Sequence, residues 1–310
     1  MTTATTDIPT TAPLSATPVA PSLRERLVGA YELTKPRMNF LILVTTAVGF
    51  YLAAGPGGLW QRAWLFAATL VGTALTAAGA SVLNQFVERD ADALMPRTRR
   101  RPLPAGLLSP AFALASGVAL GLVGTAWLAL LVNPLTAALG AFTLLSYVLV
   151  YTPMKRRTPW CTLVGAVPGA IPPMMGFTAV EGTISPGAWA LFAILFVWQM
   201  PHFYGLAILY KDDYARGGYA MLPSRPNGTL RTARQSVGFL ALLLPASLLP
   251  TLAGVAGYWY AAAAVLLWGW FFAAGVQCWR SLGKADARKL FFASILYLPL
   301  LLGVMMLDRQ

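Results

Sequence analysis

The chain reads AWLFAATLVGTALTAAGASVLNQFV over residues 63–87, and no side chain in this segment is charged. About 20 consecutive apolar residues are enough for an α-helix to cross the hydrocarbon core of a bilayer, so this segment predicts a membrane span. Eight other segments have the same length and character, at residues 38–54, 110–131, 134–151, 161–180, 186–209, 236–257, 258–279 and 288–307. No soluble domain fits between them. The sequence therefore predicts an all-α polytopic membrane protein with nine transmembrane helices.

The composition of the whole chain agrees with a membrane protein. Of its 310 residues, 57% are hydrophobic and only 11% are charged, whereas about a quarter of a typical soluble domain is charged. Cys161 and Cys278 lie in or beside apolar segments, without a CxxC partner or metal-ligand spacing. We therefore expect two free thiols rather than a disulfide or a metal site.

Residues 1–22 differ from the rest of the chain. They are rich in Thr, Ala and Pro and contain no basic residue and no continuous apolar core. A secretory signal carries both features and an organelle transit peptide is rich in arginine, so neither is predicted. We expect a disordered cytoplasmic tail, followed by a single nine-helix transmembrane domain over residues 23–310.

Basic residues gather on one side of the predicted membrane. The amino-terminal segment and every second connection hold all but two of the 23 lysines and arginines, the exceptions being Arg62 and Arg309. Basic connections stay in the cytoplasm, which places the amino terminus inside the cell (inner or plasma) membrane and the carboxyl terminus on the opposite side. The net charge of +12 thus reports topology, and no nucleic-acid partner is needed to explain it.

The first acidic cluster lies in NQFVERDAD (84–92), where the first quoted segment reaches the cytoplasm. If the helix continues, Asn84, Glu88 and Asp92 are four residues apart and line one face, whereas Asp90 points away. Like charges at this spacing repel each other, and their place at a membrane boundary adds a desolvation cost. A bound Mg²⁺ would remove both penalties, because Mg²⁺ prefers hard oxygen ligands.

Arginines follow this acidic cluster directly. MPRTRRRP (95–102) places Arg97 and Arg101 just beyond the acids, and guanidinium groups match phosphate oxygens with two parallel hydrogen bonds. Acids followed by arginines are thus suited to a diphosphate bound with Mg²⁺. Two simpler interpretations stay open: a solvated acidic helix end that pairs with Arg89, and arginines that only mark the cytoplasmic side.

A second acidic cluster, Asp212–Asp213–Tyr214, lies at the cytoplasmic end of segment 186–209 and therefore on the same side of the membrane. Two acidic helix ends on one face can hold a diphosphate between Mg²⁺ ions. No GxxxxGK[ST] motif is present, so nucleotide hydrolysis has no support. Other connections on this side add positive charge for a diphosphate from Lys35, Arg37, Lys155 and Arg156.

The chain has one histidine, His202, which lies in WQMPHFY (198–204) within a predicted span. An ionisable residue inside a membrane helix is a functional candidate, here for acceptor contact, proton handling or iron contact. Trp198, Phe203 and Tyr204 supply rings that can pack a large planar ligand. The alternative is a structural hydrogen bond beside a proline.

Segment 161–180 contains Pro168, Pro172 and Pro173 together with three glycines. A broken helix survives in lipid only where protein or a cavity satisfies its free backbone groups, so this segment is expected to face an internal chamber. A kinked packing helix whose small residues allow close approach is the equal alternative.

Three segments resemble the UbiA-type intramembrane prenyltransferases, in the version found in the protoheme IX farnesyltransferase (heme O synthase) subfamily. The likeness runs from about Lys35 to Pro223, whereas the last three spans match only in hydropathy. The three segments are NQFVERDADALMPRTRRRPLPAG (84–106), YTPMKRRTPWCTLVGAVPGAIPPMMGF (151–177) and WQMPHFYGLAILYKDDYARGGYAMLP (198–223).

The resemblance implies nine helices around a central, lipid-accessible cavity under a cytoplasmic cap, with Mg²⁺ as cofactor. Many relatives carry aspartate where this chain has Glu88, and the second motif here lacks the spaced aspartates of quinone-pathway relatives. Asn84, Glu88, Asp92 and Asp213 would hold the metal. The catalytic residues that the resemblance implies are Asn84, Glu88, Asp92, Arg97, Arg101, His202 and Asp213.

The implied reaction transfers a farnesyl group from farnesyl diphosphate to a vinyl group of heme B, with addition of water, giving heme O and diphosphate. It serves heme–copper oxidase biogenesis, and a downstream heme-modifying enzyme is a candidate partner. A related enzyme acting on a quinone precursor would carry spaced aspartates and no PHF histidine. A transporter would place charges at the midplane and show duplicated halves. A heme electron carrier would need paired axial ligands.

Overall fold

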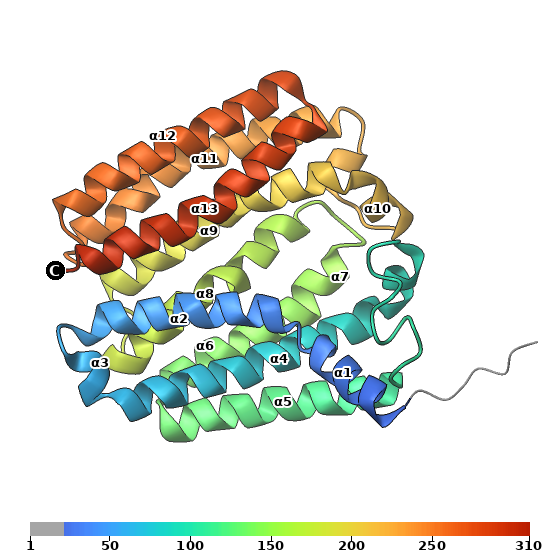
Figure 1. The fold of residues 1–310 in the computed structure, drawn as a ribbon, viewed down its shortest axis with the longest axis horizontal. Helices are drawn as coiled ribbons and strands as arrows, with labels where there is room; N and C mark the ends of the chain where they lie inside the picture. Colours follow the sequence, from blue (N-terminus) through green and yellow to red (C-terminus); the bar gives the residue numbers. More distant parts are fainter. Residues whose placement is uncertain (1–21) are drawn as a thin grey trace, which may run out of the picture.

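The computed structural model describes residues 22–310, which fold into a bundle of long helices lying side by side (Figure 1). Nine helical segments of this part of the chain are long and apolar enough to cross a membrane, with α1 (Leu23–Leu33) and α2 (Pro36–Ala54) counted as one. No β-strand occurs in residues 22–310, so the predicted all-α fold with nine spans is confirmed. The other spanning helices are α4 (Ala63–Leu94), α5 (Pro110–Leu131), α6 (Pro134–Leu145), α8 (Cys161–Glu181), α9 (Pro186–Leu209), α11 (Gly228–Leu252), α12 (Tyr258–Ser281) and α13 (Lys284–Leu307).

Shorter elements complete the bundle. α6 continues through a π-helical stretch, η1 (Ser146–Tyr151), into α7 (Thr152–Met154). The remaining short elements are α3 (Gly58–Gln61), α10 (Lys211–Arg216) and the 3₁₀ turn η2 (Leu222–Ser224). The apolar segments alone gave no signal for α1 or α10, because both helices are polar and lie outside the predicted spans.

Two helices, α4 and α11, differ most from the predicted span boundaries. α4 extends past residue 87 to Leu94, so it carries the whole first acidic cluster. α11 begins at Gly228 and ends at Leu252, whereas the sequence predicted residues 236–257. Arg231 and Arg234 made its first two turns resemble a connection, but both arginines are exposed at the helix end, where long basic side chains reach water.

The predicted amino-terminal tail lies almost wholly outside the described residues, which begin at Ser22. Ser22 itself caps α1. Its hydroxyl accepts a hydrogen bond from the Glu25 N–H at 3.3 Å, and the Glu25 carboxylate accepts one from the Ser22 N–H at 2.8 Å. This reciprocal capping box begins α1.

α8 is one continuous helix despite its three prolines, and 67% of its spanning window is buried. One of its glycines, Gly176, meets the backbone of α2, because a Cβ added there would collide with the Thr46 carbonyl oxygen. On the other helix, a Cβ at Gly49 would collide with the Pro173 carbonyl oxygen. Of the two interpretations of this segment, the structure therefore favours the packing helix with small residues at close contact.

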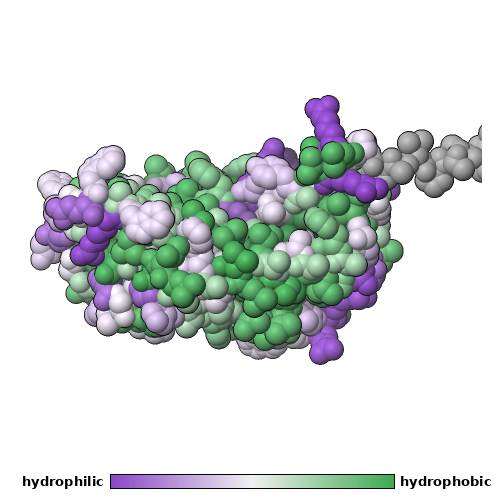
Figure 2. Space-filling view, turned by 90° about the horizontal axis from the view of Figure 1, so that it is seen from below, coloured by the Kyte–Doolittle hydropathy of each residue, from purple (hydrophilic) through white to green (hydrophobic). Residues whose placement is uncertain are grey.

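The bundle has two polar ends and an apolar middle (Figure 2). α1, α10 and the connections after α4, α7 and α12 lie at one end, and α3 and the carboxyl terminus lie at the other (Figure 1). Large apolar side chains remain exposed between the ends, among them Leu122, Leu242, Leu266 and Leu296. An exposed apolar belt of this extent fits lipid rather than water, and the protein is a multi-pass membrane protein.

Candidate functional site

Three polar side chains of α4 lie buried on one helix face near its end. Asn84, Glu88 and Asp92 are 0%, 7% and 1% exposed, respectively. The Asp90 side chain, by contrast, is 78% exposed. The predicted alignment is therefore confirmed, because the helix does continue through all three positions.

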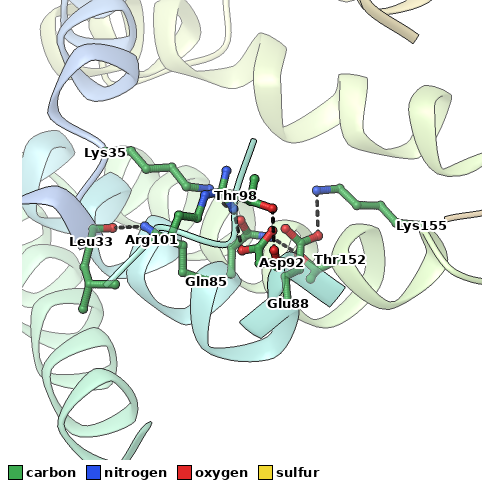
Figure 3. Close-up of polar contacts among 10 residues, drawn as sticks. Leu33, Lys35, Gln85, Glu88, Asp92, Thr98, Arg101, Thr152 and Lys155 are labelled. Atoms are coloured by element: carbon green, nitrogen blue, oxygen red, sulfur yellow. Dashed lines mark hydrogen bonds and ion pairs between the residues drawn. The ribbon is translucent and has the colours of Figure 1, made fainter. Parts of the chain in front are cut away.

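Each of these side chains contacts a cation from a different segment of the chain (Figure 3). Lys35 Nζ donates to Asn84 Oδ1 at 2.6 Å, and Lys155 Nζ donates to Glu88 Oε1 at 2.7 Å. Arg101 Nη1 donates to Asp92 Oδ2 at 2.6 Å. We call these six residues the paired cluster: Asn84, Glu88, Asp92, Lys35, Arg101 and Lys155.

The turn between α1 and α2 positions Lys35. The backbone of Lys35 has φ 50° and ψ 59°, a left-handed conformation that is uncommon for a residue other than glycine. Two buried amides fix this turn: Gln85 Nε2 donates to the Leu33 carbonyl at 2.8 Å, and Asn39 Nδ2 donates to the Thr34 carbonyl at 2.7 Å. The turn therefore directs Lys35 toward α4.

The π-helical stretch η1 positions another part of the site. Thr152 follows η1 directly, and its hydroxyl donates to the Tyr147 carbonyl at 2.8 Å. The same hydroxyl accepts a hydrogen bond from Asn84 Nδ2 at 3.0 Å. π-helical turns often occur at functional sites, and here one orients Asn84 so that its amide oxygen faces Lys35.

Lys155 lies in an aromatic and acidic cage. Its Nζ is 4.6 Å from the ring centre of Tyr151 and 5.9 Å from that of Tyr219. Burial by itself lowers the pKa of Lys155, but the neighbouring Tyr151 and Glu88 outweigh burial and raise the pKa well above its ordinary value. Lys155 therefore keeps its positive charge in this cage.

The donor set of α4 fits a magnesium ion bound together with a phosphate ligand. Asp92 Oδ1 is buried and has no hydrogen-bond partner among the described residues, so this carboxylate has an oxygen left for a further ligand. The described part of the chain contains no group of three His, Cys, Asp or Glu residues able to hold a metal. Two carboxylates and one amide instead suit Mg²⁺, which takes few protein ligands when phosphate oxygens supply the rest.

A basic cavity of about 230 Å³ adjoins the paired cluster. Arg97 shares its lining with Lys35 and Arg101, and its guanidinium lies over the rings of Tyr210 and Tyr214 at 5.1 and 5.8 Å. The predicted arginines thus gather at one cavity, and Arg97 links the loop after α4 to α10. The lining residues are Glu32, Lys35, Gln85, Arg97, Arg100, Arg101 and Pro102.

The second acidic cluster lies on α10 at the same end of the bundle (Figure 1). Asp213 pairs with Arg216 of its own helix, and Asp212 accepts a hydrogen bond from Lys284 at 3.1 Å. That hydrogen bond lowers the pKa of Asp212. Arg37 and Arg156 are exposed and make no ion pair within residues 22–310, so the structure does not bring them into the paired cluster.

His202 lies apart from the paired cluster, between α9 and α13. Its ring stacks on Trp198 at 5.1 Å and meets Phe203 edge-to-face at 5.5 Å. Phe291 of α13 adds a third ring at 4.9 Å. Tyr204 does not join this group, because it packs with Phe239 of α11 in another apolar cluster. We call residues Trp198, His202, Phe203, Phe291 and Ser294 the imidazole group.

The comparisons with known proteins agree with this arrangement. The UbiA prenyltransferase family matches residues 42–296. The chain is 47% identical to the protoheme IX farnesyltransferase of Solibacter usitatus over 284 residues, which cover 90% of this chain and 97% of that protein. It is 49% identical to that of Sorangium cellulosum over 264 residues, covering 83% and 94%. This chain belongs to the UbiA prenyltransferase family.

Solved structures of UbiA proteins share the fold. A structure of digeranylgeranylglyceryl phosphate synthase superposes with a TM-score of 0.75 at 16% identity, covering 92% of this chain and 98% of that chain. A UbiA homologue from Archaeoglobus fulgidus bound to GPP and Mg²⁺ gives a TM-score of 0.59 at 16% identity, covering 89% and 99%. The bundle of this chain is thus the UbiA fold, and the chain is a prenyltransferase of that family.

Sequence reasoning missed several residues of this UbiA bundle. Thr152 and Tyr151 lay inside the quoted segment 151–177, but no spacing rule linked them to Asn84. Gln85 adjoins Asn84 in the quoted motif and points to the α1–α2 turn instead of the acids. Phe291 and Ser294 gave no signal, because they lie in an apolar span that matches the family only in hydropathy.

Proposed function

We propose that this chain transfers a farnesyl group from farnesyl diphosphate to a vinyl group of heme B, with addition of water, giving heme O and diphosphate. Relatives that share 47–49% identity over nearly their whole length bear the name protoheme IX farnesyltransferase, which supports this substrate pair. The observation that carries the proposal is the paired cluster, where three cations and two buried carboxylates meet at one end of an apolar bundle.

The paired cluster is the proposed diphosphate site. Lys35, Arg101 and Lys155 each hold one oxygen ligand of α4, and each can exchange that ligand for a phosphate oxygen when the donor binds. Arg97 reaches the same cavity from its stacking position on Tyr210 and Tyr214. The exposed Arg37 and Arg156 would add long-range attraction for the anionic donor.

The metal-binding residues of the proposal are Asn84, Glu88 and Asp92, with Asp213 contributed by α10. A bound Mg²⁺ would supply positive charge that stabilises the departing diphosphate. The chain's own cations share this role, because preorganised charges in a site shielded from water act most strongly where charge develops.

The apolar interior of the bundle is the proposed place of the farnesyl chain. The C1–O bond of the donor breaks as diphosphate leaves, and C1 forms a bond to the terminal vinyl carbon of heme B. The hydroxyl of one water molecule then adds to the other vinyl carbon, and the proton of that water is released. Excluding water before this last step protects the allylic carbon from hydrolysis.

The imidazole group is the proposed acceptor site. Trp198 and Phe203 offer flat surfaces for a porphyrin, and the imidazole of His202 supplies a polar group between them. Tyr204 supports the same helix from the opposite side. Flat rings around one polar group suit a large, mainly apolar acceptor.

The membrane orientation follows from the charge pattern. We propose that the end carrying the paired cluster faces the cytoplasm of the cell (inner or plasma) membrane and that the carboxyl terminus lies on the opposite side. The diphosphate donor would then enter from the cytosol. A downstream heme-modifying enzyme that takes up the product remains a proposed partner.

The experiment that tests the function uses purified protein in lipid nanodiscs with heme B, farnesyl diphosphate and Mg²⁺, followed by mass spectrometry. We expect a product heavier than heme B by one farnesyl group and one hydroxyl, and no product after chelation of Mg²⁺. Prenylation of a quinone precursor without any heme product would overturn the acceptor and leave the prenyl-transfer chemistry intact.

A further inference from the structure

Ser294 on α13 contacts the other members of the imidazole group through its hydroxyl and carbonyl oxygens. Its hydroxyl oxygen lies 2.8 Å from His202 Nδ1 and 2.5 Å from the Phe291 carbonyl oxygen. Its own carbonyl oxygen accepts a hydrogen bond from Trp198 Nε1 at 2.9 Å. Ser294 is fully buried, so no water competes for these contacts. Two side chains of α9, one helical turn apart, are therefore anchored on a single serine.

The positions of the protons follow from these contacts. A carbonyl oxygen only accepts, so the 2.5 Å contact with Phe291 requires the single hydroxyl proton of Ser294. The Ser294 oxygen must then accept from His202, which places a proton on Nδ1. A neutral imidazole carries one N–H, so Nε2 holds a free lone pair.

Nε2 of His202 is not fully closed off by protein. Nε2 makes no hydrogen bond to any described residue. Four polar side-chain atoms of residues 22–310 are fully buried without a partner, and Nε2 is not one of them. Trp198, Phe203 and Phe291 surround the ring and restrict its rotation. The Nε2 lone pair of His202 is therefore held in one orientation.

We propose that Ser294 is a positioning residue that locks His202 in the Nδ1–H tautomer and presents the Nε2 lone pair to the iron of the bound porphyrin. This inference rests on the proposed function, with a metalloporphyrin as the acceptor. An oxygen that accepts from one imidazole nitrogen while the other faces a metal is the usual way proteins orient such a ligand. No carboxylate of residues 22–310 contacts this imidazole, so the hydroxyl alone sets the tautomer.

The tautomer is measurable without any enzymatic assay, because His202 is the only histidine of the chain. Protein labelled with ¹⁵N-histidine and purified with a tag free of histidine gives the two nitrogen shifts of this one ring. We expect Nδ1 protonated and Nε2 unprotonated in the wild type. A wild-type ring protonated at Nε2, or at both nitrogens, would overturn the inference.

Ser294→Ala is the matching variant, and Ser247→Ala is its control. Ser247 is equally buried and hydrogen-bonds Tyr297 of the same helix α13 at 2.8 Å, without touching His202. We expect Ser294→Ala to move the nitrogen shifts toward the Nε2–H form and Ser247→Ala to leave them unchanged. Unchanged shifts in Ser294→Ala would contradict the role of the hydroxyl.

Heme binding supplies the second readout. Ser294→Ala should weaken binding of heme B about tenfold and shift its absorption spectrum, with the KM for farnesyl diphosphate unchanged, whereas Ser294→Thr keeps the hydroxyl and restores both. Wild-type heme affinity and spectrum in Ser294→Ala would overturn the positioning role even if heme O is formed. If the wild type forms no heme O but shows the Nδ1–H tautomer, only the proposed function would be contradicted.

Discussion

The paired cluster and the imidazole group lie in the same bundle, yet different forces hold them. In the paired cluster, three cations from three separate segments contact buried oxygens of one helix. In the imidazole group, aromatic rings surround one histidine, and its single hydrogen bond goes to a neutral hydroxyl. The difference indicates two sites with separate tasks, one for an anion with a metal and one for a flat, apolar acceptor.

The largest expected effect comes from removing one charge from the paired cluster. Asp92→Asn removes the only anionic partner that Arg101 has within residues 22–310, and it removes one of the carboxylates proposed for Mg²⁺. We expect the rate of heme O formation at saturating Mg²⁺ to fall at least about hundredfold. Asp90→Asn is the control on the same helix, because its exposed side chain should leave turnover unchanged. Full turnover in Asp92→Asn would exclude the metal site.

The next effect separates stability from activity. Lys155→Met leaves Glu88 buried without its cation, and breaking a buried ion pair costs about 3–5 kcal/mol. Chemical unfolding in detergent micelles measures this loss in free energy of unfolding. Arg156→Met, one residue further on and exposed, should change it by less than about 1 kcal/mol. Equal losses in the two variants would show that the Lys155–Glu88 contact stabilises nothing.

Substitutions in the imidazole group should change the KM for the acceptor, heme B, and not the KM for the donor. His202→Ala removes the proposed iron contact, and we expect the KM for heme B to rise about tenfold while the KM for farnesyl diphosphate stays constant. Tyr204→Phe, which alters a neighbouring ring in a separate cluster, serves as the control and should change neither constant. A parallel rise in the KM for farnesyl diphosphate would mean that the two sites are not separate.

The smallest effect concerns the exposed ion pair between Asp212 and Lys284. Asp212 has a lowered pKa because of its hydrogen bond to Lys284, so the folded state favours its charged form. The contribution of this pair to stability is present above the pKa of an unfolded aspartate and disappears as the pH falls through the lower folded value. Asp212→Asn should therefore lower Tm slightly at neutral pH, and the difference from wild type should vanish in acid. A difference that grows in acid would have the wrong sign.

Much of the paired cluster was readable from the sequence because it obeys local rules. The four-residue spacing of Asn84, Glu88 and Asp92 needed only a continuous helix to bring the three side chains onto one face. The apolar segments predicted the span count, and the alternation of basic connections checked it, because a missed span would have placed basic residues at both ends. These features depend only on residues that are close together in the sequence, so they can be predicted without knowing the tertiary structure.

The basic residues that pair with the α4 side chains could not be predicted in the same way. Lys155 and Arg156 are adjacent in the sequence, but only Lys155 turns inward and contacts Glu88, whereas Arg156 is exposed. Lys35 reaches Asn84 through a left-handed turn that two distant amides hold. Tyr204 belongs to the quoted WQMPHFY motif but faces another helix, since consecutive helical residues point in different directions. Such choices depend on tertiary packing.

The most direct test of two separate sites is the affinity of a non-reactive thiolo analogue of farnesyl diphosphate, measured by calorimetry in nanodiscs with and without Mg²⁺. The account predicts that binding of the analogue needs Mg²⁺, is lost in Asp92→Asn and is unchanged in His202→Ala. Heme B binding should need no Mg²⁺, stay unchanged in Asp92→Asn and weaken about tenfold in His202→Ala. Analogue binding that survives both chelation of Mg²⁺ and the Asp92→Asn substitution would contradict the assignment of the paired cluster as the diphosphate site.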